Sequence, residues 1–289
     1  MSYVTKVILV TGGNKGIGYA IVRNLALSYV KSSSQPLTIL LTARNPTLGQ
    51  SSIDKLREEL KPNNVLIDDG GNVDLKFLRL DITDEQSIKD VKDVIEKDYE
   101  GLDVLINNAA IAFKGDAFDI NVVRTTFATN FYGTLNVINH LYPLIRKNGR
   151  IVNVSSLAGE LHIVSKALGQ EFSNENLDMD GLIELMKRFE NAVEKGTYKQ
   201  EGWPRQAYGT SKLGVTTMTR ILAHRADKEG NGIKVFACHP GWVKTDLAGE
   251  RAPLTPGMYS HYCAKIPVLL ALDEDIVVQN PNGSYFKDK

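Results

Sequence analysis

The sequence predicts an α/β protein built on a doubly wound parallel sheet. Short apolar runs alternate with segments of helix length, and the first apolar run leads directly into a glycine-rich loop. Continuous apolar runs are typical of parallel strands that are covered on both faces. A repeated strand–helix–strand order places the connecting helices on the two faces through right-handed crossovers. We therefore expect three layers, with the sheet between two layers of helices.

The predicted strands and helices alternate along the chain. Six strands are expected at 6–12, 37–44, 75–81, 102–109, 149–156 and 233–241. Helices are expected at 16–30, 51–61, 84–98, 121–147 and 206–229. Such sheets bind ligands outside the carboxyl ends of their strands. Nearly every polar motif described below lies at such an end or on the helix that follows it.

One long segment interrupts the alternation. Residues 157–203 separate the fifth strand from the last predicted helix, whereas a typical loop has about four to six residues. Five apolar residues of this segment share one helical face and precede a glycine that would end the helix: Leu182, Leu185, Met186, Phe189, Val193 and then Gly196. We predict a helical insertion within a single domain that spans residues 1–289.

Composition excludes several classes of protein. The 34 basic and 34 acidic residues give zero net charge, whereas nucleic-acid and membrane-surface proteins usually carry a basic excess. No apolar run approaches the roughly 20 residues that span a bilayer, and the first residues do not resemble a signal peptide. Cys238 and Cys263 form no metal or disulfide pattern, so we expect free, at least partly buried thiols. We therefore expect a cytoplasmic protein without a metal, a nucleic-acid partner or a membrane partner.

The loop after the first strand has the spacing Thr-Gly-x-x-x-Gly-x-Gly, with Gly12, Gly16 and Gly18. Residues without Cβ allow a tight turn and a close approach of the backbone to a pyrophosphate. The phosphates would then meet free N–H groups at the positive end of a helix. Three glycines could serve only a tight turn, but their place between a strand and a helix favours dinucleotide binding.

The end of the second strand indicates which dinucleotide binds. An acidic residue there usually binds a free ribose 2′-hydroxyl. This chain has Arg44 instead, with no carboxylate before Asp54, and Lys15 lies inside the glycine loop. Two cations suit a 2′-phosphate, so NADPH is favoured over NADH. The alternative is that Arg44 is a solvated surface charge.

Two further strand ends suit other parts of a dinucleotide. Asp81 could accept a hydrogen bond from the adenine amino group; otherwise it would cap the next helix, for which Thr83 or Asp84 is better placed. The run Asn-Asn-Ala-Ala at 107–110 has small residues that would let a ring approach the backbone. Tight packing between strand and loop is the alternative explanation for this run.

Ser155 and Ser156 follow the fifth strand, and Tyr208 and Lys212 lie four apart on the next helix. A free phenol has a pKa of about 10, and a neighbouring ammonium is expected to lower it. A serine hydroxyl could hold a carbonyl oxygen within reach of that phenol. Such a set suits protonation of a carbonyl oxygen during hydride addition. A lone Tyr-x-x-x-Lys pair is usually a surface tyrosine beside a solvated lysine, but its combination with the other motifs favours a catalytic role.

Together these motifs resemble those of the short-chain dehydrogenase/reductase family, and most closely its monomeric carbonyl reductases from animals. The matching segments include VTGGNKGIGYAIVRNL, LTARN, GLDVLINNAAIAF, TNFYGT, GRIVNVSS, EGWPRQAYGTSKLGVT and ACHPGWVKTDLAG, spread from residue 10 to about 249. The resemblance implies a Rossmann-type fold with seven strands. It also implies NADPH-dependent reduction of ketones, aldehydes or quinones.

The resemblance also implies residue roles. Tyr208 would donate the proton, Lys212 would lower the pKa of Tyr208, and Ser156 would orient the substrate. Asn130 would hold a water of the proton relay, although it could instead stabilise a helix kink. Trp242 would line the substrate pocket. The implied cofactor-binding residues are Gly12, Asn14, Lys15, Gly16, Ile17, Gly18, Arg44, Asp81, Asn107, Ala109, Tyr208, Lys212, Pro240, Gly241, Val243 and Thr245.

The insertion matches the one that covers the oligomerisation face in this subgroup, so the resemblance implies a monomer. Three features depart from the family pattern: Ala110 replaces a usual glycine, His239 replaces a frequent cysteine, and the insertion sequence diverges. His239 either contacts a polar group of the substrate or lies solvated in its loop. Two other functions stay open, namely a reductase dedicated to one natural-product or pterin ketone and a non-catalytic NADPH sensor.

Overall fold

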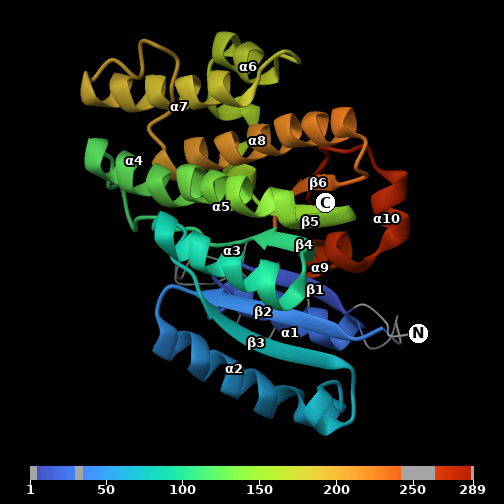
Figure 1. Cartoon of the computed structure of the whole chain (residues 1–289). Coiled ribbons are helices and arrows are strands. Elements are labelled where there is room, and N and C mark those ends of the chain that lie inside the picture. The colour runs from blue at the N-terminus through green and yellow to red at the C-terminus, as the bar shows by residue number, and fades with distance from the viewer. Residues whose placement is uncertain (1–4, 30–34, 242–263, 288–289) are drawn as a thin grey trace.

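The computed structural model describes residues 5–29, 35–241 and 264–287, and within them the chain forms one parallel sheet of seven strands (Figure 1). The strand order is β3-β2-β1-β4-β5-β6-β7. The strands are β1 (Lys6–Val10), β2 (Leu37–Ala43), β3 (Val73–Arg79), β4 (Leu102–Asn107), β5 (Ile145–Val154), β6 (Lys234–Cys238) and β7 (Tyr285–Phe286). The expected Rossmann-type doubly wound fold is confirmed.

The order of strands reverses beside β1. From β1 the chain builds outward through β2 to β3, then returns to place β4 on the other side of β1 and continues toward β7. Ligands in such sheets bind at this switch, outside the carboxyl ends of the strands. The glycine loop and the run at 107–110 both start there, immediately after β1 and β4.

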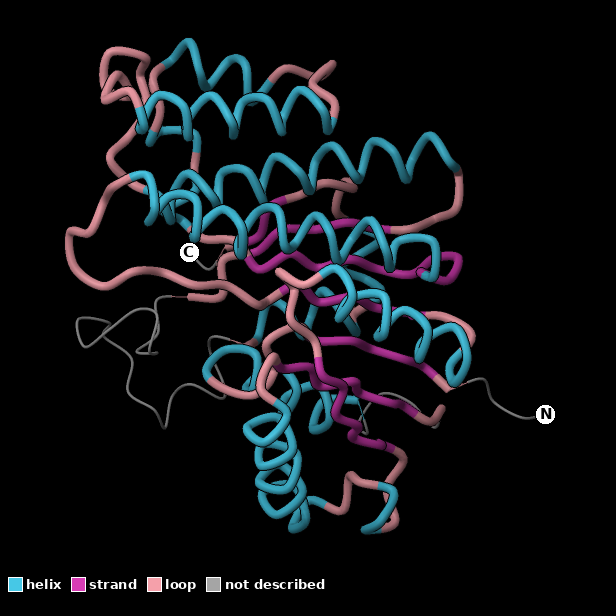
Figure 2. The backbone as a smooth tube through the Cα atoms, turned by 60° about the vertical axis from the view of Figure 1, so that its left-hand side comes forward, coloured by secondary structure: helices cyan, strands magenta, loops and turns pink. Residues whose placement is uncertain are grey.

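Helices cover both faces of the sheet, as expected (Figures 1 and 2). One apolar core joins the sheet to α1 (Gly16–Tyr29), α2 (Pro46–Leu60), α9 (Lys265–Leu272) and α10 (Glu274–Gln279). The other joins it to α3 (Glu85–Tyr99), α4 (Ile120–Phe127), α5 (Thr134–Leu141) and α8 (Ala207–Glu229). A π-helical turn, Ala128–Gly133, connects α4 to α5.

The start of α2 was missed in the sequence. The helix begins at Pro46 rather than at 51, because Asn45 caps it: the Asn45 side chain accepts a hydrogen bond of 3.0 Å from the Leu48 backbone N–H. Proline is favoured at the first helical position, where its missing N–H costs nothing. The pair Asn45-Pro46 could therefore have predicted the start of α2.

The predicted helix 121–147 differs from the structure in two ways. The π-helical turn Ala128–Gly133 interrupts it, and it ends earlier than expected. Helix α5 stops at Leu141, and Pro143 lies in the 3₁₀ turn that follows, because proline cannot continue the backbone ladder. Strand β5 then starts at Ile145, earlier than the predicted 149. Its register against β4 shifts, and Asn148 has a φ of +62° in the irregular stretch.

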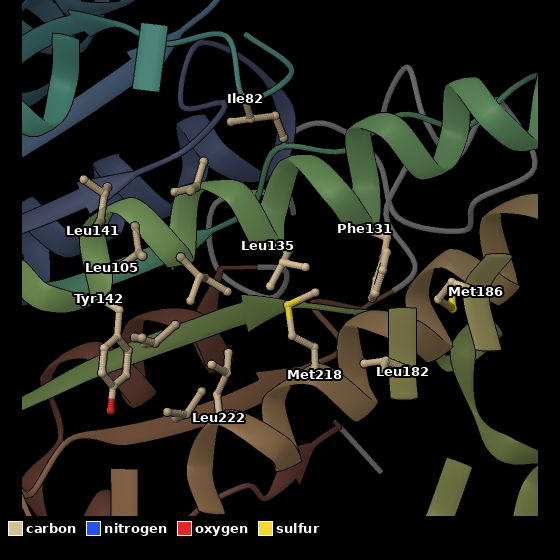
Figure 3. Packing of buried hydrophobic residues seen from close by; sticks show 14 of the residues in the cluster. Ile82, Leu105, Phe131, Leu135, Leu141, Tyr142, Leu182, Met186, Met218 and Leu222 are labelled. Carbon is tan, nitrogen blue, oxygen red and sulfur yellow. The ribbon is translucent and has the colours of Figure 1, made fainter. Parts of the chain in front are cut away.

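The insertion contains two helices, α6 (Lys166–Ser173) and α7 (Met179–Glu194), and α7 packs against α4 and α8 (Figure 1). The predicted face of α7 is confirmed, with Leu182, Leu185, Met186 and Phe189 buried and Val193 partly buried. Figure 3 shows Leu182 and Met186 beside residues of the main core such as Met218. Each buried side chain of this size contributes roughly 1.5–3 kcal/mol of transfer free energy, which holds the insertion in place. Helix α6 was not predicted.

Candidate active site

The two serines after β5 face different neighbours. The Ser155 hydroxyl contacts α8, where it donates to the Lys212 carbonyl at 3.1 Å and lies 2.7 Å from the Thr216 hydroxyl. The Ser156 hydroxyl instead hydrogen-bonds to the hydroxyl of Tyr208, and its oxygen also accepts from the Ala158 backbone N–H at 3.2 Å. The structure therefore brings Ser156, and not Ser155, to the phenol that the sequence indicates.

Tyr208 lies on the first turn of α8 and is half-buried. Burial raises the pKa of its hydroxyl to about 12, and the hydrogen bond from Ser156 opposes this only in part. The pKa of Tyr208 therefore lies above its ordinary value, whereas a lowered pKa was expected. The Lys212 ammonium lies 5.8 Å from the centre of the Tyr208 ring, and loss of water around the phenol outweighs it. At neutral pH Tyr208 is consequently a protonated donor.

Lys212 is buried one turn further along α8. Its ammonium donates a hydrogen bond of 2.7 Å to the Val154 carbonyl at the end of β5. Burial lowers the pKa of Lys212 to about 8, while the neighbouring thiol of Cys238 acts weakly in the other direction. Burial also raises the pKa of Cys238 to about 12, so this free thiol is an inert part of the core.

Asn130 lies fully buried in the π-helical turn between α4 and α5. Its side-chain oxygen accepts from the Ile111 N–H at 2.8 Å, and its amide donates to the Ile111 carbonyl at 2.9 Å and to the Ser211 hydroxyl at 3.0 Å. Both amide donors are thus used, one in joining the π turn to the loop after β4 and the other in joining it to α8. A relay water would have to bind the Asn130 backbone carbonyl or the remaining lone pair of its side chain.

A buried polar chain crosses the sheet beside these residues. Asn107, at the end of β4, donates to the Asn153 side chain at 2.9 Å, and Asn153 donates to the Thr219 hydroxyl of α8 at 2.9 Å. The side-chain oxygen of Asn107 is buried and accepts no hydrogen bond within the described ranges. Asn153 and Thr219 were missed, although Asn153 stands out as a polar residue within an apolar strand.

The glycine loop folds as its spacing predicts. Gly12 and Gly16 have φ values of +64° and +55°. A Cβ on Gly18 would lie 2.2 Å from the Gly12 carbonyl oxygen, so only glycine fits there. Two residues that the sequence reasoning did not single out fix this loop: the Thr11 hydroxyl accepts from the Asn108 backbone N–H, and the Asn108 amide donates to the Thr11 carbonyl, both at 2.9 Å.

Cations lie exposed at the neighbouring strand ends. Lys15 is exposed in the glycine loop, and 78% of the Arg44 side chain is open to solvent after β2. The Arg44 guanidinium lies 4.0 Å from the Asp81 carboxylate, whose other oxygen accepts from the Thr83 backbone and hydroxyl. Asp84, and not Asp81, caps α3, as expected.

This edge fits a dinucleotide. It combines a turn that a single Cβ would block at Gly18, a buried acceptor on Asn107 without a partner in the described chain, and exposed cations at Lys15 and Arg44. Asn14 and Ala109 lie half-buried on the same loops, Ile17 lies half-buried in the first turn of α1, and Pro240 and Gly241 follow β6 after His239. Trp242, Val243, Thr245 and Cys263 lie outside the described residues.

Comparison with known proteins identifies the family. Residues 6–168 match the family described as short chain dehydrogenase, and residues 180–277 match the one described as Enoyl-(Acyl carrier protein) reductase. The chain belongs to the short-chain dehydrogenase family.

Curated relatives match this short-chain dehydrogenase over its full length. Carbonyl reductase [NADPH] 1 of Homo sapiens is 40% identical over 296 residues, covering 100% of this chain and 98% of the relative. The Sus scrofa protein of the same name is 41% identical and is covered over 94% of its length. Carbonyl reductase [NADPH] 3 of Rattus norvegicus is 39% identical and is covered over 98%.

Solved structures share the fold. Salutaridine reductase from Papaver somniferum has a TM-score of 0.77 at 25% identity, covering 97% of this short-chain dehydrogenase and 99% of that protein. Menthone neomenthol reductase from Mentha piperita has a TM-score of 0.76 at 24% identity, with 98% of each chain covered.

The described part of the structure accommodates two of the departures from the family pattern, Ala110 and His239. Ala110 is half-buried, and the adjoining Ile111 keeps both backbone hydrogen bonds to Asn130. His239 is half-buried rather than fully solvated, and its backbone N–H donates to the Phe286 carbonyl at 2.8 Å. Within the described ranges no cluster of side chains suits a metal ion, and none of the helices combines the length and apolarity of a membrane span.

Proposed function

We propose that this protein is an NADPH-dependent carbonyl reductase that reduces ketones, aldehydes or quinones. The observation that carries the proposal is the hydrogen-bonded pair Ser156–Tyr208 with buried Lys212, at the same sheet edge as the glycine loop. Relatives named as NADPH carbonyl reductases, about 40% identical over their full length, support the same chemistry.

The cofactor would be held along the carboxyl edge of the sheet. When bound, it supplies the hydride that adds to the carbonyl carbon. The proposed contacts are Gly12, Asn14, Lys15, Gly16, Ile17, Gly18, Arg44, Asp81, Asn107, Ala109, Tyr208, Lys212, Pro240 and Gly241, with Val243 and Thr245 outside the described residues. Lys15 and Arg44 would bind the 2′-phosphate, because guanidinium and ammonium groups match a phosphate dianion that a carboxylate would repel.

The chain's own residues would handle the oxygen of the substrate. Ser156 orients the carbonyl oxygen, and Tyr208 donates its proton as negative charge develops there. The Tyr208 hydroxyl, with a pKa above neutral pH, is protonated there, as proton donation during reduction requires. The buried charge of Lys212 stabilises the phenolate left behind, and Asn130 would bind the water through which the proton is restored. Trp242, outside the described residues, would border the substrate.

A substrate screen tests the proposal. Loss of NADPH absorbance would be followed with menadione, isatin, simple aldehydes and sepiapterin, and in parallel with NADH. We expect turnover of several carbonyl compounds and a strong preference for NADPH. Tight NADPH binding without turnover of any carbonyl compound would contradict the proposal and favour a non-catalytic NADPH sensor.

A narrower reductase, dedicated to one natural-product ketone, is the second candidate. The full-length structural match to salutaridine reductase, at 25% identity, favours it. The same screen separates the two candidates, because a dedicated enzyme would turn over one class of compound and leave menadione and isatin unchanged.

We also propose that the protein is a single-domain, cytoplasmic monomer. Residues from both family matches share one sheet, which supports a single domain. Helix α7 covers α4 and α8 with buried side chains, which supports a monomer. Sedimentation should give the chain mass of 31.9 kDa, and a dimer mass would contradict the monomer. Cell fractionation tests the location.

A further inference from the structure

Ser211, which directly precedes Lys212 on α8, is completely buried. Its hydroxyl donates a hydrogen bond of 2.7 Å to the Tyr208 carbonyl, almost one helical turn earlier. The same oxygen accepts a hydrogen bond of 3.0 Å from the side-chain amide of Asn130. A hydroxyl has one proton to donate, so the bond to Tyr208 leaves only acceptor positions for Asn130. Ser211 therefore joins the helical turn of the proposed proton donor to the π turn Ala128–Gly133.

The bonds around Asn130 determine the orientation of its side chain. Its oxygen accepts from the Ile111 N–H at 2.8 Å, while its amide donates to the Ile111 carbonyl and to the Ser211 hydroxyl. The reverse orientation would place the oxygen opposite a carbonyl and the amide donors opposite an N–H. Asn130 is fully buried, and a buried polar group without a partner is unfavourable. Without the Ser211 hydroxyl, one Asn130 donor would lose its partner.

The π turn contacts α8 at a second point on the same helical face. Gly214 lies three residues after Ser211, and a Cβ there would lie 2.8 Å from the Phe131 ring. Phe131 directly follows Asn130, is fully buried and points toward α8 (Figure 3). Close packing at Gly214 and the hydrogen bond at Ser211 together fix where the π turn lies against α8. Single π turns are rare and are frequently found at functional sites.

We propose that Ser211 is a positioning residue for the return of the proton to Tyr208. The inference rests on the proposed carbonyl reductase function, in which Asn130 binds the water that restores this proton. Ser211 holds Asn130, and with it the acceptor for that water, at a fixed place beside the turn that carries Tyr208 and Lys212. Because Ser211 has no exposed surface, it acts through Asn130 and not by touching the substrate.

The test compares Ser211→Ala with the unaltered enzyme in the reduction of menadione. We expect kcat to fall about 10–100-fold, because a small displacement of a catalytic group has an effect of this size. KM for menadione and Kd for NADPH should stay within about twofold, since neither molecule contacts Ser211. The solvent deuterium isotope effect on kcat should rise, because return of the proton becomes the slow step.

Thr210→Val is the matched control. Thr210 is equally buried, and its hydroxyl donates to the Gln206 carbonyl at the start of the same helix at 2.7 Å. This variant should keep kcat and the isotope effect of the unaltered enzyme. Equal losses of kcat in the two variants, or an unchanged isotope effect in Ser211→Ala, would overturn the proposal. If Ser211→Ala does not fold, Ser211→Cys replaces it with the same outcomes, since a thiol is only a weak acceptor for the Asn130 amide.

A measurement without turnover separates this proposal from the proposed function. If the unaltered protein reduces no carbonyl compound, the proposed function fails, but the placement of Asn130 can still be tested. The Ile111 N–H donates to the Asn130 side chain, so its hydrogen exchange, followed by NMR, reports on that placement. We expect exchange at Ile111 to be about tenfold faster in Ser211→Ala and unchanged in Thr210→Val. Equal exchange in all three proteins would overturn the role of Ser211.

Discussion

The carboxyl edge of the sheet, where we propose that ligands bind, has two halves that differ in the groups they present. At the ends of β1 and β2 the site consists of backbone, with the glycine loop held by Thr11 and Asn108 and with exposed Arg44 beside it. At the end of β5 and on α8 it consists of side chains, among them half-buried Ser156 and Tyr208 and buried Lys212. We call these the cofactor half and the catalytic half.

The difference follows from the task of each half. A dinucleotide has a fixed shape and charge, so a backbone turn and surface cations can hold it. A proton transfer changes charge during the reaction, so its residues need pKa values set by burial and by neighbours. Variants in the two halves should therefore fail in different ways.

The largest effect is expected from Gly18→Ala in the cofactor half. The added Cβ would lie 2.2 Å from the Gly12 carbonyl oxygen and 2.5 Å from the Asn108 amide, so the loop must move. We expect NADPH binding, measured by fluorescence titration, to weaken by about 10²–10³-fold. Gly169→Ala in α6, where an added Cβ meets nothing within 4 Å, is the control. Binding within about threefold of the unaltered protein would show that the turn is not rigid.

Lys212→Met sharpens the account of the catalytic half. The folded-state pKa of Lys212 is about 8, below its ordinary value of 10.5, so between these values the unfolded chain binds more protons. The free energy of unfolding of the unaltered protein should therefore rise between pH 8 and 10.5, by about 3 kcal/mol from this residue. In Lys212→Met that rise should disappear. Urea unfolding at several pH values measures how the free energy of unfolding depends on pH in both proteins. Equal pH dependence in the two proteins would contradict a lowered pKa of the buried Lys212.

A smaller effect is expected from Arg44→Ala. We expect KM for NADPH to rise about tenfold, because charge-assisted hydrogen bonds to the 2′-phosphate are lost at an exposed site. KM for NADH should stay unchanged, since NADH lacks this phosphate. Arg188→Ala, which removes an exposed ion pair on α7, is the control. Equal changes in KM for NADPH and for NADH would mean that Arg44 does not bind the 2′-phosphate.

The cofactor half could be predicted well from the sequence, because its signals are local. Gly12, Gly16 and Gly18 lie within seven residues of one another, and their conformations follow from the absence of a Cβ. That Tyr208 and Lys212 lie one turn apart on the same helix could also be predicted, since about four residues make one helical turn. The expected strands β1 to β6 were found because their apolar runs are long enough to recognise.

Other features depend on contacts that sequence spacing does not show. The pKa of Tyr208 moves opposite to the expectation, because burial arises from the packing of the whole fold and not from its neighbour Lys212. Strand β7 has only two residues, too few for a pattern, so its position was not predicted. The π turn at Asn130 depends on hydrogen bonds to Ile111, nineteen residues earlier.

The most direct test of the central claim is NADPH oxidation by Tyr208→Phe with a quinone that the unaltered enzyme reduces. The variant keeps the ring and removes only the proton donor. We expect its turnover to fall at least about 10³-fold while its Kd for NADPH stays unchanged. Turnover within about tenfold of the unaltered enzyme would contradict the assignment of Tyr208 as the proton donor.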